Sequence, residues 1–115
     1  MDVTIYHNPR CSKSRLTLQL LQSKNCNPIV VEYLKTPPSA ESLQKILDAL
    51  GMKPRDLIRT GEPVYKSENL GNPDLADDVL IRKMIENPIL IERPVVVSGD
   101  KAAIGRPPEQ VLEIL

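Results

Sequence analysis

A strand, a helix and a second strand follow one another within the first third of the chain. Residues 2–6 alternate apolar and polar side chains, which predicts a strand. Residues 12–24 contain no glycine or proline and predict an amphipathic helix. Its apolar face consists of Leu16, Leu20 and Leu21, with Leu18 on the flank. A β-branched run at residues 29–33 predicts a second strand. Strands joined through one helix pair in parallel with a right-handed crossover, so the fold class is α/β.

A helical block occupies the middle of the chain. Ser39 is a good N-cap for a helix that Gly51 ends, residues 53–59 predict a short helix, and Asn72-Pro73 opens a longer one. No repeat or long linker separates this block from its flanks. We therefore expect residues 1–115 to form one domain with one core, in which residues 39–88 are a helical insertion packed on the sheet.

The last quarter of the chain returns to strands. Residues 93–98 contain a β-branched run, Val95 to Val97, behind Pro94. Gly99-Asp100 is typical of a tight turn, and residues 101–104 can form the partner strand of a hairpin. Residues 110–115 predict a final helix. The expected order is β-α-β, helical insertion, β-β-α, around a mixed sheet.

Composition excludes several classes of protein. Fifteen basic residues balance fifteen acidic ones, so no overall positive field favours nucleic acid or an anionic membrane. No apolar run approaches the roughly 20 residues of a membrane-spanning helix, and the start of the chain lacks the apolar segment of a signal peptide. The expected location is the cytoplasm, and a monomer is the default for such a balanced surface.

Two cysteines, Cys11 and Cys26, are far apart in the sequence and match neither a disulfide framework nor zinc-ligand spacing. We expect no bound metal or cofactor. Cys11 lies where the first strand meets the first helix, beside basic residues and the only histidine, His7. The unpaired N–H groups and positive dipole end of a helix favour a thiolate there, so the sequence predicts a nucleophile. A cysteine that merely occupies a tight turn is the structural alternative.

Ser14 stands three residues after Cys11, where a C-x-x-C motif would carry its second cysteine. The site is therefore monothiol, and the Ser14 hydroxyl could donate a hydrogen bond to the sulfur. Cys26 follows the far end of a helix of about 13 residues, near 20 Å away at 1.5 Å per residue. We interpret Cys26 as structural or incidental.

Arginine can hold an oxyanion with fixed planar donors, and three arginines occupy positions that look structural. These are Arg59, Arg93 and Arg106. The others are interpreted as surface charges, of which the first two add a general field at the site: Arg10, Arg15, Arg55 and Arg82. Pro94 either begins an edge strand or follows a cis peptide bond, and spacing alone does not decide between the two.

Several motifs in order along nearly the whole chain resemble the arsenate reductase family of the glutaredoxin-dependent kind. They are YHNPRCSKSR, YLKTPP, LIRTGE, NPILIERPVVV and GRPPE. The resemblance implies a thioredoxin-like fold, with Cys11 as catalytic nucleophile and His7 and Ser14 tuning it. It also implies that the three arginines bind the oxyanion and that the bond before Pro94 is cis.

The same resemblance implies reduction of arsenate to arsenite, with glutathione as co-substrate and glutaredoxin as partner. Two alternatives stay open on this scaffold. One is an enzyme that reduces another oxyanion or glutathione mixed disulfides. The other is a redox-linked transcription regulator of the Spx kind, which binds RNA polymerase and whose C-x-x-C pair is absent here because Ser14 replaces the second thiol.

Overall fold

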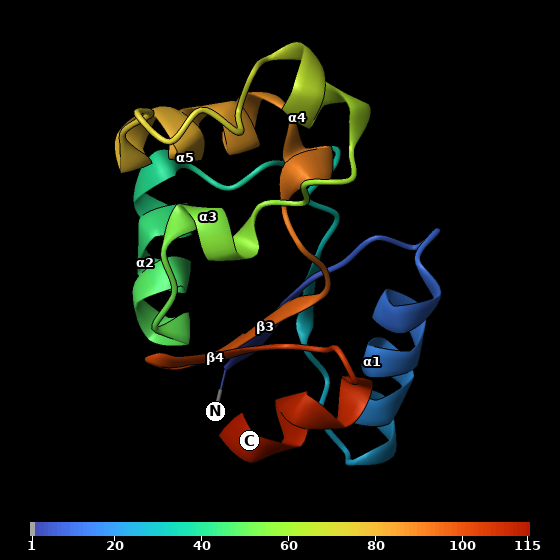
Figure 1. The fold of residues 1–115 in the computed structure, drawn as a ribbon. Helices are drawn as coiled ribbons and strands as arrows, with labels where there is room; N and C mark the ends of the chain where they lie inside the picture. The colour runs from blue at the N-terminus through green and yellow to red at the C-terminus, as the bar shows by residue number, and fades with distance from the viewer. Residues whose placement is uncertain (1) are drawn as a thin grey trace. The chain divides into compact units, whose positions relative to one another are not determined.

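The computed structural model describes residues 2–115, which form two compact units (Figure 1). The first unit combines the two ends of the chain, Met1–Thr36 and Arg93–Leu115. The second unit is the intervening segment Pro37–Glu92. That these units make a single domain stays a prediction.

A four-stranded mixed sheet forms the first unit. Its strands are β1 (Val3–Tyr6), β2 (Ile29–Val31), β3 (Val95–Ser98) and β4 (Lys101–Ile104), in the order β2-β1-β3-β4. β1 pairs with β2 in parallel, while β3 is antiparallel to both β1 and β4. Gly99 has a φ of 62° in the turn between β3 and β4, a conformation that glycine adopts without strain. The predicted β-α-β unit, hairpin and mixed sheet are confirmed.

Two helices of the first unit pack against each other, α1 (Ser12–Ser23) and the 3₁₀ helix η2 (Pro108–Ile114) (Figure 1). Buried side chains from both helices and from β1 and β3 make one cluster, which consists of Val3, Ile5, Leu21, Val96 and Val111. Val3 and Ile5 come from alternate positions of β1, as the sequence pattern predicts. The last helix was expected at residues 110–115, and the structure starts it at Pro108 as a 3₁₀ helix.

The predicted apolar face of α1 is wrong in its first half. Leu16 is 49% exposed, and the buried residues of the helix are Ser14, Thr17 and Leu21. The reason is close packing: a Cβ atom on Gly105, just after β4, would lie 2.4 Å from Thr17 Oγ1. Only small side chains fit where the helix and this turn meet.

The second unit is helical, as predicted. It contains α2 (Ala40–Leu50), α3 (Pro54–Leu57), α4 (Pro63–Ser67), α5 (Asp77–Glu86) and the 3₁₀ helix η1 (Pro88–Leu90). The Ser39 hydroxyl accepts a hydrogen bond from Ser42 N at 3.1 Å and caps α2, which ends at Gly51 with a φ of 68°. α2 and α3 both pack against α5.

Two features of this unit differ from expectation. The Asn72-Pro73 pair does not open α5, because Asn72 Oδ1 accepts a hydrogen bond from Asp74 N and forms a turn instead. The guanidinium of Arg55, expected to be a surface charge, donates to the carbonyl oxygens of Leu70 and Asn72. Arg55 therefore fixes the loop after α4 to α3.

Candidate active site

Cys11 is the N-cap residue of α1, with an extended backbone at φ −94° and ψ 124°. Its N–H donates to Asn8 O at 3.0 Å, and its carbonyl accepts the N–H of Arg15 at 3.0 Å. The thiol is therefore carried on a closed turn at the positive end of a helix of 12 residues. Cys11 is half-buried and forms no disulfide.

Side chains brace the turn that carries the cysteine. Asn8 Oδ1 accepts the N–H of Arg10 at 3.0 Å, and Arg15 Nη1 donates to Pro9 O at 2.9 Å. The bond from Arg15 was not foreseen, because its acceptor is a main-chain carbonyl, which has no signature in sequence. Arg15 is a brace of the loop as well as a nearby charge.

His7 and Ser14 form a buried pair next to this turn. The His7 side chain, which is 6% exposed as a residue, places Nδ1 2.6 Å from the Oγ of fully buried Ser14. The same oxygen accepts the N–H of Asn8 at 3.0 Å. Burial lowers the pKa of His7 below 6.5, Glu32 acts in the opposite direction, and Arg15 lowers it further. The imidazole is therefore biased toward its neutral form.

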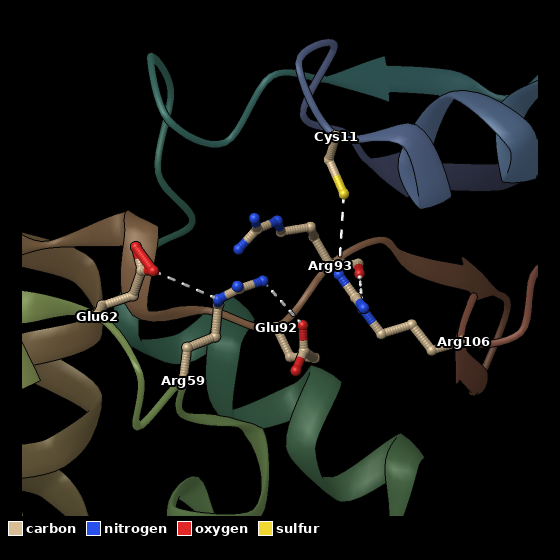
Figure 2. Close-up of polar contacts among 6 residues, drawn as sticks. All are labelled: Cys11, Arg59, Glu62, Glu92, Arg93 and Arg106. Atoms are coloured by element: carbon tan, nitrogen blue, oxygen red, sulfur yellow. Dashed lines mark hydrogen bonds and ion pairs between the residues drawn. The ribbon is translucent and has the colours of Figure 1, made fainter.

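Arg106 reaches the cysteine from the turn after β4. Its Nη2 lies 3.8 Å from Cys11 Sγ, and its Nε donates to the carbonyl oxygen of Arg93 at 2.8 Å (Figure 2). Gly105 N donates to Pro94 O at 2.9 Å, which ties this turn to the start of β3. The Arg93-Pro94 bond is cis, and so is the Arg106-Pro107 bond, which the sequence did not indicate. Cys11, Arg93 and Arg106 thus come together within the first unit.

Arg59 lies in the second unit, between α3 and α4. Its Nη1 is 3.2 Å from Glu92 Oε1, and its Nε is 3.8 Å from Glu62 Oε2 (Figure 2). Two partly buried carboxylates therefore neutralise and orient this guanidinium. The participation of Arg59 in an oxyanion site stays a prediction that rests on its motif.

The part of the chain that the structure describes contains no second cysteine centre and no metal centre. Cys26 is a free thiol that packs against the core cluster of the first unit, at the other end of α1 from Cys11. Residues 2–115 contain no group of three or more His, Cys, Asp or Glu side chains that could hold a metal ion. Within the same residues, no helix is long and apolar enough to cross a bilayer.

The fold and the cysteine turn define a class of protein. Order β-α-β followed by β-β-α, with a cysteine at the first helix N-terminus, is a thioredoxin-like fold, and close structural relatives share it. The arsenate reductase of Vibrio cholerae has a solved structure that superimposes with a TM-score of 0.97 at 52% identity, covering 100% of this chain and 98% of that one.

Sequence relatives give the family. The ArsC family model matches residues 6–114. The arsenate reductase of Haemophilus influenzae is 53% identical over 116 residues, covering both chains in full. The protein YfgD of Escherichia coli is 54% identical over 115 residues, covering 99% of this chain and 97% of its own. The chain belongs to the ArsC family, and its relatives named arsenate reductase support an enzymatic role.

Proposed function

We propose that this protein reduces arsenate to arsenite with Cys11 as the nucleophile. The observation that carries the proposal is the contact between the Cys11 thiol, at the N-terminus of α1, and the guanidinium of Arg106. A guanidinium keeps its charge beside the sulfur, so it can hold the oxyanion that the sulfur attacks. The family and the names of its members supply the substrate class.

Oxyanion binding is assigned to Arg93 and Arg106, with Arg59 as the third member on the strength of its motif. Arg106 Nε is bound to Arg93 O, and its Nη2 lies on the side of the sulfur. One nitrogen of the guanidinium thus fixes the side chain while another faces the reacting atom. Such fixed donors need little reorganisation as charge develops on the oxyanion.

His7 and Ser14 are assigned to tuning the nucleophile. The Ser14 hydroxyl joins His7 to the Asn8 N–H, so these residues fix the turn directly before Cys11. A neutral His7 can accept a proton, or relay one through its two ring nitrogens, beside the turn that carries Cys11. Ser14 is held by two partners at the position that a second thiol would occupy in a C-x-x-C motif.

The reaction then needs an external thiol. The Cys11 thiolate attacks arsenic(V), and one arsenate oxygen leaves as water after protonation, which gives a thiol–arsenate adduct. Two external thiols supply two electrons, arsenic(III) is released as arsenite, and the thiols end as a disulfide. We assign these thiols to glutathione, with glutaredoxin restoring the enzyme, in the reducing cytoplasm.

Exchange of each cysteine for serine tests the proposal. Cys11→Ser should abolish arsenate reduction measured as NADPH oxidation in the presence of glutathione, glutaredoxin and glutathione reductase. Cys26→Ser is the matched control, because Cys26 packs on the core at the other end of α1, and it should keep the wild-type rate. Phosphate and selenate assayed in parallel test the choice of oxyanion. Equal arsenate turnover by Cys11→Ser and wild type would contradict the proposal.

A further inference from the structure

A small cavity lies beside the cysteine turn, entirely within the first unit. Its volume is about 290 Å³, at the lower end of the range for small-molecule sites. One wall consists of residues 7–10, and the other consists of Glu32, Leu34 and Lys35, which follow β2. Arg10 directly precedes Cys11, so the first wall ends about 3.8 Å, one Cα–Cα step, from the nucleophilic residue.

Charges of both signs line this cavity. Arg10 and Lys35 contribute two cations, and Glu32 contributes one carboxylate. Lys35 Nζ lies 3.7 Å from Glu32 Oε1. The side chain of Glu32 is 44% exposed and that of Lys35 is 79% exposed. An ion pair this exposed is weak, so a ligand with matching charges can exchange for either member. Leu34, which is 39% exposed, adds an apolar surface to the lining.

The proposed reaction needs a thiol that approaches Cys11 from outside the protein. Ser14 offers no thiol, and Cys26 packs on the core beyond the far end of α1. A small peptide thiol that carries two carboxylates and one ammonium group complements two cations and one carboxylate. A thiol in the middle of such a molecule stays close to the cavity wall that ends at Cys11.

The geometry points to this cavity as the binding site for a peptide thiol of the glutathione class. The inference rests on the proposed function and adds to it the place where the co-substrate binds. Arg10 and Lys35 bind the two carboxylates, and Glu32 binds the ammonium group. His7 and Asn8 also line the cavity, but their side chains brace the cysteine turn, so they are unsuitable for testing the ligand contacts.

Binding of S-methylglutathione, whose sulfur cannot react, tests the inference without arsenate. Chemical-shift changes in a ¹⁵N-labelled sample should cluster at residues 7–10 and 32–35. Arg10→Ala and Lys35→Ala should each weaken binding about three- to fivefold, as for ion pairs at an exposed surface, and about tenfold or more together. The control Lys24→Ala, at the exposed C-cap of α1, should bind like wild type.

Kinetics separate this inference from the proposed function. In the coupled assay, Arg10→Ala and Lys35→Ala should raise the KM for glutathione and leave the KM for arsenate unchanged. A rise in the arsenate KM alone would make these residues part of a general field and overturn the inference. Binding elsewhere, unaltered binding by the variants, or no detectable binding would overturn it too. An inactive wild-type enzyme that still binds S-methylglutathione in the cavity would instead refute the arsenate reductase assignment.

Discussion

Replacement of Gly105 by alanine would insert a methyl group between α1 and the turn that carries Arg106. The new Cβ atom would lie 2.4 Å from Thr17 Oγ1 and 2.8 Å from Pro94 Cγ, both closer than real Cβ contacts. Neither neighbour can easily move away. Thr17 is fully buried and its Oγ1 donates to Lys13 O at 2.7 Å, while the Pro94 ring is fixed to the backbone. The backbone after β4 must therefore shift.

The cost follows from known overpacking effects. Extra methyl groups in packed interiors destabilise by about 1–3 kcal/mol, and two contacts below 3.0 Å place Gly105→Ala in the upper part of that range. We expect a loss of about 2–3 kcal/mol, or roughly 30- to 140-fold in the folding equilibrium. Because the shift displaces Arg106, kcat/KM for arsenate should fall about tenfold or more in the folded fraction.

Urea unfolding followed by far-UV circular dichroism measures the stability, since the chain has no tryptophan. Gly61→Ala is the matched control, because a Cβ atom there meets nothing within 4 Å, and its stability should be unchanged or raised by up to about 1 kcal/mol. Thr17→Ala should relieve part of the clash, so the double variant should be at least about 1 kcal/mol more stable than the sum of the single effects predicts. A stability for Gly105→Ala within about 0.5 kcal/mol of wild type, or strict additivity, would refute the packing argument.

Two further predictions concern His7 and Arg55. His7 is the only histidine, so its ring NMR signals are unambiguous, and its pKa should lie below 6.5 because burial disfavours the imidazolium. As the pH falls, the unfolded chain takes up the proton first, so the stability that neutral His7 contributes is complete above pH 6.5 and is lost as the pH falls through the folded pKa. His7→Asn should lack this pH dependence in urea unfolding. A measured pKa of His7 at or above 6.5 would contradict the prediction. Arg55→Ala should destabilise by about 1.5–3 kcal/mol in the same measurement, because it removes two hydrogen bonds from a charged donor, whereas exposed Arg82→Ala should change little. Equal stabilities of the Arg55 and Arg82 variants would contradict the prediction that Arg55 stabilises the loop after α4.

Strands, helix caps and helix ends that depend on local backbone chemistry could be predicted from the sequence. The strands at residues 2–6 and 93–98, the cap at Ser39 and the stop at Gly51 all appear where periodicity and turn residues place them. The helix start predicted at Asn72-Pro73 is wrong because an Asx turn and a helix N-cap use the same residue types. The partners of Arg15 and Arg55 are main-chain carbonyls, which any residue can supply, so no pattern could reveal them.

The buried face of α1 shows why helical periodicity alone misplaces a helix beside a reactive site. Leu16 has the apolar character of a core position, yet Ser14 and Thr17 are buried in its place. Thr17 lets the turn at Gly105 approach α1 closely, and that turn carries Arg106 to within 3.8 Å of the Cys11 sulfur. A leucine at position 17 would add apolar burial but force the helix and the turn apart. Less apolar surface is therefore buried at the end of α1 where the guanidinium must reach the thiol. Large apolar side chains such as Leu21 are buried only further along the helix.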